Sequence, residues 1–194
     1  MKGGGDAVLA ARAVIQTGDF DFAWNTQVKD QVLLEFESSA NAKGRVEIVP
    51  SMAIEHIAIN RTDPWTEVDG ERSSTKTKHP LSGDPAVNRA LRLLIDRASI
   101  QAHIYGRTGI ATGNFINSTE RFVSKNTIWE FNVEKANELL DEAGWMRGPH
   151  GIRAKEGEKL KLVFQTSNNA PRQKMQAIVK QACQRQVSAR YSSR

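Results

Sequence analysis

Histidine and cysteine are the residue types that most often bind metal ions or act as nucleophiles, and their spacing here favours neither role. The chain of 194 residues contains a single cysteine and four histidines: Cys183, His56, His79, His103 and His150. No two histidines are four residues apart, and no second cysteine is present to complete a thiolate site or a disulfide. We therefore expect no metal site, and we interpret the histidines as packing or surface groups.

Acidic pairs and glycine runs are the other patterns that could do chemistry. Asp141 and Glu142 are adjacent and could supply a general acid and base, but solvation of a helix surface explains them equally well. Gly3 to Gly5 precede Asp6 as in an anion cradle, yet the Lys-Ser/Thr of a phosphate loop does not follow. The sequence has no Gly-x-Ser-x-Gly turn. These patterns predict a protein that is not an enzyme and that needs no cofactor.

A tryptophan and two asparagines are the candidate binding residues. Residues 20–24 alternate aromatic and other side chains, which predicts a strand that ends at Trp24 and Asn25. A second predicted strand, residues 54–60, ends at Asn60. Ligands of layered α/β proteins bind where strands open into loops. Trp24, Asn25 and Asn60 are therefore predicted to line a cleft, with burial of Trp24 in a core as the alternative.

Helical periodicity and capping residues predict the elements that position these groups. Helices are expected over residues 7–17, 29–39, 85–98, 99–105, 133–143 and 171–182. The clearest helix follows Asp84 as N-cap and has Pro85 in its first turn. Its predicted core-facing stripe consists of Val87, Leu91, Leu94, Ile95 and Ala98. Further strands are expected over residues 45–49 and 160–164, with a long polar loop between residues 60 and 82. This order predicts an α/β or α+β fold in layers.

Composition excludes some classes of protein. Hydrophobic residues make up 39% of the chain and charged residues 25%, which is slightly lean for a globular domain but far from a disordered composition. No apolar run approaches the roughly 20 residues that span a bilayer, so no direct membrane insertion is expected. The net charge is +5, but residues 159–194 carry eight basic residues and no acidic one. We expect no nucleic-acid partner, since no aromatic platform accompanies these charges; a basic nucleic-acid-binding module stays as an alternative.

Three segments together resemble one family, the extracellular solute-binding proteins of peptide and nickel ABC transporters, known as family 5. Residues 84–97 read DPAVNRALRLLIDR, which is similar to a signature where Asp-Pro-x-Val-Arg-x-Ala-Leu leads into Ala-Ile-Asp-Arg. Residues 131–145 read FNVEKANELLDEAGW, similar to Pro-Glu-Lys-Ala-x-x-Leu-Leu-x-Glu-Ala-Gly-Trp. Residues 18–24 read GDFDFAW, similar to the family's Gly-Glu-x-Asp-Phe strand. Asn88 stands where the family usually has arginine.

The resemblance implies a fold, a ligand and partners. The fold is α/β, a partial two-lobed periplasmic-binding-protein fold (class II-like) with mixed sheets and flanking helices. Residues 1–55 would be the C-terminal part of the first lobe, and residues 56–186 the hinge strand and the start of the second. The ligand would be a peptide enclosed between the lobes, and the partners the permease subunits of an ABC transporter. A receptor of the same family for nickel, opines or another solute is the alternative.

The resemblance also implies a location and a longer chain. Family members are periplasmic or extracellular, yet Met1 and Lys2 precede glycines rather than an apolar run, so no signal peptide is predicted in this chain. Residues 187–194 match nothing in the family and are predicted to be a disordered tail. We therefore interpret the chain as an incomplete copy.

Overall fold

The fold consists mainly of short helices joined by long connections. The computed structural model describes residues 5–49, 51–149 and 151–186. Helices in these residues are α1 (Ala7–Arg12), α2 (Asp30–Glu37), α3 (Pro85–Leu93), α4 (Arg97–Ile100), α5 (Val133–Glu142) and α6 (Ala170–Gln186). Strands are β1 (Glu67–Val68), β2 (Glu71–Arg72), β3 (Met146–Arg147), β4 (Arg153–Lys155) and β5 (Glu158–Lys159). The tail at residues 187–194, Gly3, Gly4 and His150 lie outside the described residues.

The helices begin where the sequence predicts because their caps are local. Asp6 accepts a hydrogen bond from Leu9 N at 3.0 Å, Asp84 from Ala86 N at 2.8 Å, and Asn132 from Lys135 N at 2.9 Å. Each bond satisfies a backbone N–H that has no partner within its helix. α1 continues as a π-helical turn, Ala13–Thr17, and ends at Gly18 in the left-handed conformation with φ of 69°. The predicted helices of residues 7–17, 29–39, 99–105 and 133–143 are confirmed to within a few residues.

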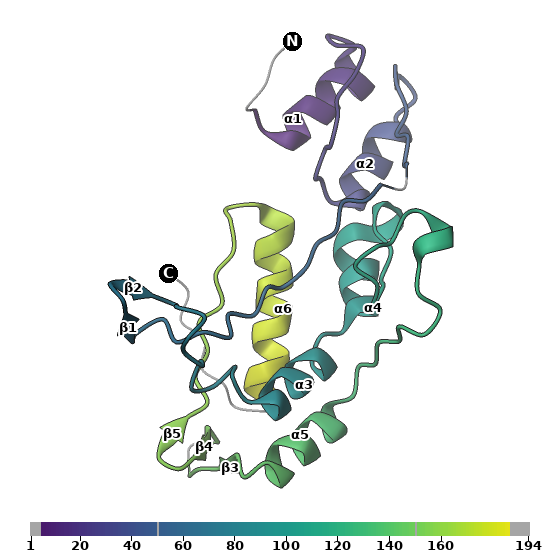
Figure 1. The fold of residues 1–194 in the computed structure, drawn as a ribbon. Helices are drawn as coiled ribbons and strands as arrows, with labels where there is room; N and C mark the ends of the chain where they lie inside the picture. The colour runs from purple at the N-terminus through teal and green to yellow at the C-terminus, as the bar shows by residue number, and fades with distance from the viewer. Residues whose placement is uncertain (1–4, 50, 150, 187–194) are drawn as a thin grey trace.

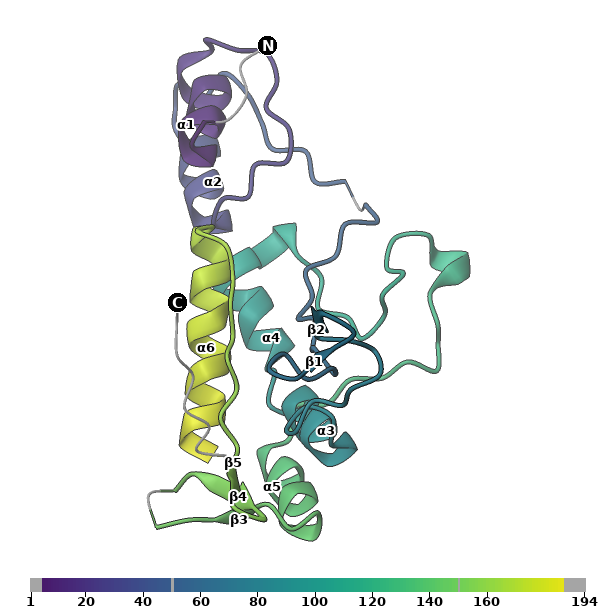
Figure 2. The same ribbon diagram turned by 60° about the vertical axis from the view of Figure 1, so that its left-hand side comes forward.

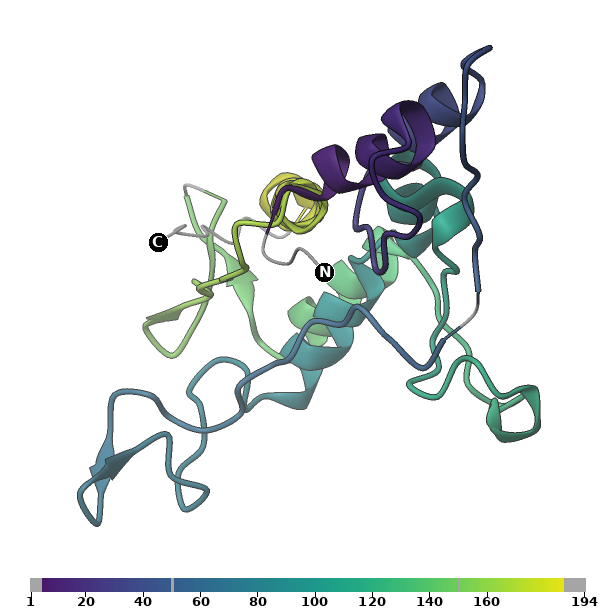
Figure 3. The ribbon, with the colours of Figure 1, turned by 90° about the horizontal axis from the view of Figure 1, so that it is seen from above.

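The molecule is elongated, with the N-terminal helices at one end. α1 and α2 lie above the rest of the chain in Figures 1 and 2, and β3–β5 lie at the opposite end. α6 runs along the long axis and is seen end-on in Figure 3. The β1–β2 hairpin and the connection between α4 and α5 project from two corners of the molecule (Figure 3). The described strands form an antiparallel pair, β1–β2, and an antiparallel sheet of order β3-β4-β5.

The buried hydrophobic residues form two separate clusters. The smaller cluster belongs to α1, α2 and the segments beside them; its buried members are Ala11, Ile15, Val28 and Leu33. The larger cluster gathers α3, α4, α5 and α6 around the segment that follows β5. Its buried members are Leu81, Val87, Ala90, Leu94, Ile100, Ile104, Ala136, Leu140, Trp145, Leu160, Val179 and Cys183. Residues before and after position 50 therefore have their own cores.

Four predicted strands do not form in the described chain. Residues 20–24, 45–49, 54–60 and 160–164 have no strand assignment. Leu160, Leu162 and Phe164 are nonetheless more buried than their neighbours, so the alternation of burial is present without the ladder. A strand exists only when a neighbouring backbone pairs its N–H and C=O groups; of the segment 160–164, Leu160 N is described as donating to a neighbouring strand, to Arg153 O of β4 at 2.8 Å.

The helix predicted over residues 85–98, which carries the first family signature, is shorter than predicted. α3 ends at Leu93, and Asp96 caps a new helix by accepting hydrogen bonds from Ser99 N at 2.9 Å and Ser99 Oγ at 2.6 Å. This second cap interrupts the helical stripe, so Ala98 is exposed rather than core-facing. Residues 86–93 are helical as expected, and residues 94–96 are not.

Candidate functional site

Trp24 and Asn25 lie on the connection between α1 and α2, and both are exposed. Trp24 retains 81% of its accessible surface, so it is not buried in a core of the described chain. Asn25 adopts a left-handed backbone conformation with φ of 53°, a conformation that asparagine tolerates better than most residues. An indole this exposed is available to contact a ligand or another part of a protein.

Asn60 lies elsewhere, at the start of the polar loop before α3. Its side-chain Oδ1 accepts hydrogen bonds from Thr62 N at 3.0 Å and Thr62 Oγ1 at 2.7 Å, and its carbonyl accepts one from Ser82 Oγ. No described hydrogen bond or ring contact joins Asn60 to Trp24 or Asn25. The cleft formed by these three residues therefore stays a prediction.

An arginine that the sequence did not single out ties the N-terminal helices to the rest of the chain. Arg107 donates from its backbone N to Asp30 Oδ2 at 2.9 Å and from Nε to Asp30 Oδ1 at 2.8 Å. The Asp30 side chain is only 10% exposed, so this pair is better shielded than a surface ion pair. Gly106 has φ of 52°, and a Cβ there would overlap the Asp30 carboxyl group. Glycine at position 106 therefore allows the backbone to approach α2 closely.

Glu37, at the end of α2, adds a second carboxylate to the same arginine. Its Oε2 accepts a hydrogen bond from Arg107 Nη2, and its Oε1 accepts one from Val46 N at 2.6 Å. These two bonds, with the charge of Arg107, lower the pKa of Glu37 below its ordinary value of 4.5. The carboxylates of Asp30 and Glu37 in turn raise the pKa of Arg107. One guanidinium thus joins both ends of α2 to the turn after α4.

A second arginine pairs across the same boundary. Arg172, in the first turn of α6, donates to both carboxylate oxygens of Glu55, with Nη2 to Oε1 at 2.6 Å and Nε to each oxygen at 3.1 Å. Beside it, Asn169 Nδ2 donates to Gln27 Oε1 at 3.0 Å. Such forked arginine–carboxylate pairs fix orientation as well as distance. Polar side-chain contacts of Arg107, Arg172 and Asn169 thus connect segments of the described chain that are far apart in sequence.

The described histidine and cysteine side chains with buried positions are held by hydrogen bonds or core packing. His79 is buried, and its Nδ1 accepts hydrogen bonds from Leu81 N at 3.0 Å and Ser82 N at 3.2 Å; burial lowers its pKa. Among the described residues, no group of three or more His, Cys, Asp or Glu side chains could hold a metal ion. Cys183 is fully buried on α6 and packs in the larger core cluster.

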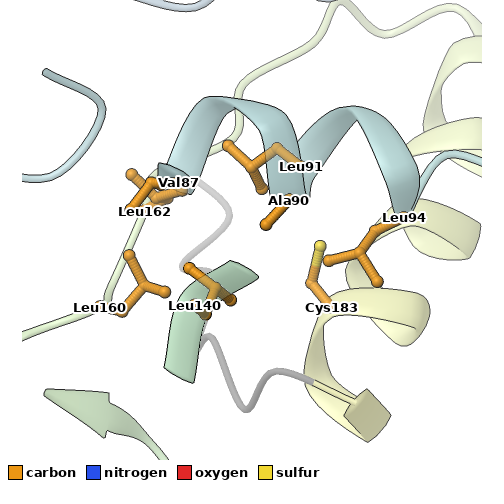
Figure 4. Close-up of a pocket in the computed structure, with 8 residues that line it drawn as sticks. All are labelled: Val87, Ala90, Leu91, Leu94, Leu140, Leu160, Leu162 and Cys183. Atoms are coloured by element: carbon orange, nitrogen blue, oxygen red, sulfur yellow. The ribbon is translucent and has the colours of Figure 1, made fainter. Parts of the chain in front are cut away.

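The best-defined described cavity is a gap in the hydrophobic core. It has a volume of about 10 Å³ and lies between α3, α5, α6 and the segment after β5 (Figure 4). Its lining residues are Val87, Ala90, Leu91, Leu94, Leu140, Leu160, Leu162 and Cys183. A space of this size barely admits one water molecule, and its walls offer no polar partner. It is therefore a packing gap and not a ligand site.

Comparison with known proteins identifies the class to which this arrangement belongs. Residues 5–186 match the model of the bacterial extracellular solute-binding proteins, family 5 Middle. The oligopeptide-binding protein AppA of Bacillus subtilis (strain 168) is 26% identical over 181 residues, which are 89% of this chain and 29% of that protein.

Solved structures show the same fold. The oligopeptide-binding protein of Thermus thermophilus, complexed with a pentapeptide, aligns with a TM-score of 0.51 at 21% identity, over 58% of this chain and 20% of that one. Lactococcal OppA, complexed with an endogenous peptide in the closed conformation, aligns with a TM-score of 0.50 at 24% identity, over 60% of this chain and 22% of that one. NikA of Brucella suis, in complex with Fe(III)-EDTA, aligns with a TM-score of 0.51 at 25% identity, over 59% of this chain and 24% of that one.

The fold is thus part of the two-lobed α/β fold of periplasmic binding proteins, as the sequence predicted. More particularly, the chain belongs to family 5 of the bacterial extracellular solute-binding proteins. It spans less than a third of the length of its curated relative.

Proposed function

We propose that this chain is part of the substrate-binding component of an ABC transporter, which captures peptides between two lobes without catalysis and delivers them to a permease. The match to family 5 over residues 5–186 carries this proposal. The relative AppA is named as an oligopeptide-binding protein, which favours peptides over other solutes. We place the protein in the periplasm or outside the cell. No described helix is long and apolar enough to cross a membrane.

The proposal assigns residues 5–55 to one lobe and residues 56–186 to the hinge and the start of the other. Two observations support this division: each part has its own hydrophobic cluster, and arginine–carboxylate pairs connect them. Polar contacts suit a boundary that must open, because ion pairs can exchange with water at lower cost than a packed apolar core. Trp24, Asn25 and Asn60 are proposed to contact the ligand when the lobes close.

A metal complex is the second candidate ligand. NikA, at 25% identity, was solved with Fe(III)-EDTA, so members of this fold group accept chelated metals as well as peptides. In that case the metal would arrive inside its chelate as cargo, and no protein cluster of metal ligands would be needed.

Isothermal titration calorimetry of the chain distinguishes these ligands. A mixture of di- to pentapeptides is expected to give saturable heat, and nickel with histidine is expected to give none. Trp24→Ala is expected to weaken peptide binding, by about 0.5–1.5 kcal/mol if the indole stacks on the ligand. Trp65→Ala is the matched control, since Trp65 is also exposed but contacts His79 edge-on with ring centroids 5.4 Å apart. Heat with nickel–histidine alone would replace the peptide proposal with the metal one, and equal losses in both variants would remove Trp24 from the site.

A further inference from the structure

His79 begins the turn of residues 79–84, which closes the polar loop before α3. It is buried, and its Nδ1 accepts hydrogen bonds from Leu81 N at 3.0 Å and Ser82 N at 3.2 Å. Leu81 and Ser82 are themselves only 4% and 3% exposed, so water cannot readily replace the acceptor of either N–H. A nitrogen that accepts from two N–H groups carries no proton, and the site therefore requires a neutral ring with its proton on Nε2.

The turn also holds the β1–β2 loop, residues 61–78, against the start of α3. His79 N donates to Arg61 O at 2.8 Å, and Ser82 Oγ donates to the carbonyl of Asn60. The ring of Trp65 meets the His79 ring edge-on, with centroids 5.4 Å apart. Loss of the His79 ring from its site would remove the Trp65 contact and leave the turn without the acceptor that shapes it.

The bonds inside the β1–β2 loop do not depend on His79. β1 and β2 pair with each other, and Asp63 joins the two sides of the loop. Its N–H donates to Thr77 Oγ1 at 3.0 Å, and its carbonyl accepts a hydrogen bond from Ser73 N at 3.0 Å. The hairpin projects from a corner of the molecule (Figure 3). The loop can therefore move away from the turn as a unit and keep its own structure.

Asp63 is the acidic group that acts on His79 from the loop. Its negative charge favours the protonated ring, but burial of the ring has the larger effect and lowers the pKa of His79 below its ordinary value of 6.5. The Asp63 carboxylate accepts hydrogen bonds from Trp65 N at 2.8 Å and Thr66 Oγ1 at 2.6 Å. It cannot turn toward the ring without breaking these bonds.

Lys78 and Asp84 are the charged residues that flank the turn. Lys78 lies along Gly83, where a Cβ would overlap its side chain, and it has no acceptor to offer. Asp84 directs its oxygens to the first turn of α3 and to Trp145. Neither residue therefore supplies an acceptor for a proton on Nδ1 of the ring.

We propose that His79 is a pH-sensitive latch: protonation of its Nδ1 expels the ring from the turn and releases the β1–β2 loop from the start of α3. The protonated nitrogen faces the N–H groups of Leu81 and Ser82, so two attractions become repulsions. α3 keeps its cap, because Asp84 accepts from Ala86 N without involving His79. The change is confined to the loop and its turn, and it does not depend on the proposed transport function.

Amide hydrogen exchange, corrected for the intrinsic effect of pH on exchange, measures the release. In the released loop His79 has its ordinary pKa of 6.5, so each pH unit below that value favours release about tenfold. Protection of the Leu81 and Ser82 amides should fall about tenfold between about pH 7.5 and about pH 5.5, with no change in α5. The indole N–H signal of Trp65 in ¹H–¹⁵N NMR spectra should shift with the same midpoint, since the indole leaves the His79 ring.

A variant separates the latch from general effects of acid. His79→Asn places an amide oxygen near the position of Nδ1 and does not titrate in this range, so the turn should form and the pH dependence should disappear. His103→Asn is the matched control, because His103 is exposed; the pH dependence should remain. If His79→Asn does not fold, ¹⁵N NMR of the His79 ring in the unchanged chain decides, and its titration should coincide with the loss of protection. A midpoint above 6.5, a pH dependence retained in His79→Asn, or an equal loss of protection in α5 would overturn the proposal.

Discussion

Replacing Asp84 by alanine should cost more than the loss of a helix cap. Asp84 Oδ1 caps α3 through Ala86 N, while Oδ2 accepts a hydrogen bond from Trp145 Nε1 at 3.0 Å and lies 3.4 Å from Lys155 Nζ. One carboxylate therefore joins α3, the turn after α5, and β4. Burial opposes the ionisation of Asp84, but the bonds from Trp145 and Ala86 outweigh it and lower the pKa.

The magnitude follows from these contacts. Loss of an N-cap costs about 1 kcal/mol. Trp145 is only 2% exposed, so leaving its indole N–H without an acceptor costs about 1–3 kcal/mol more. The Lys155 pair is partly exposed and adds less than about 1 kcal/mol. Asp84→Ala should therefore lower the free energy of unfolding by about 2–4 kcal/mol.

Urea unfolding followed by circular dichroism measures this loss. Asp6→Ala is the matched control, because Asp6 caps α1 through Leu9 N alone and should cost about 1 kcal/mol. In a Trp145→Phe background, Asp84→Ala should cost only the cap, since no indole N–H is left unpaired. Equal losses in the free energy of unfolding for Asp84→Ala and Asp6→Ala, or no coupling with Trp145, would refute the inference that Asp84 connects α3, the turn after α5, and β4.

Three further predictions test the boundary and the core. Gly106→Ala should destabilise the chain by more than about 1 kcal/mol, seen as a lower melting temperature, because a Cβ would overlap the Asp30 carboxyl group in a backbone conformation that disfavours it. The pKa of Glu37 is lowered in the folded state, so its contribution to the free energy of unfolding is full above its ordinary pKa and is lost as pH falls through the folded value. Between about pH 6 and about pH 3, the free energy of unfolding should therefore fall less in Glu37→Gln than in the unchanged chain. Arg153→Met should cost about 2–3 kcal/mol in urea unfolding, because Arg153 is fully buried and its removal leaves the Trp145 carbonyl without its donor and Asp141 without its ion-pair partner.

The helices were predictable because their signals are local. Asp6, Asp84 and Asn132 each cap a helix within three residues, and the cap predicted at Asp84 is confirmed. The cap at Asp96 has the same form and interrupts the predicted helix of residues 85–98. Its signal is equally local, since an Asp before a helical segment is a preferred N-cap.

The strands were less predictable because pairing depends on distant backbone. Residues 60–82 were predicted to be a loop, and the β1–β2 hairpin within them was missed. Asp69 and Gly70, with φ of 55° and 80°, form its two-residue turn, and an Asp-Gly pair is a strong hairpin signal. Glu156 and Gly157 make the corresponding turn between β4 and β5.

The candidate site was the least predictable part. The contact of Arg107 with Asp30 joins residues 77 positions apart, and nothing in the spacing of either residue indicates it. Trp24 was singled out as an aromatic side chain at the end of an extended segment, but its exposure depends on what the neighbouring helices leave uncovered. A single sequence contains no direct information on such long-range contacts.

Peptide is proposed to bind between residues 5–55 and the remainder of the chain. Amide hydrogen exchange with and without the mixture of di- to pentapeptides tests it most directly, because protection reports local opening along the whole backbone. We expect slower exchange in both residues 20–30 and residues 54–60 when peptide is added. Protection confined to one of these segments, or no change in either, would contradict the claim.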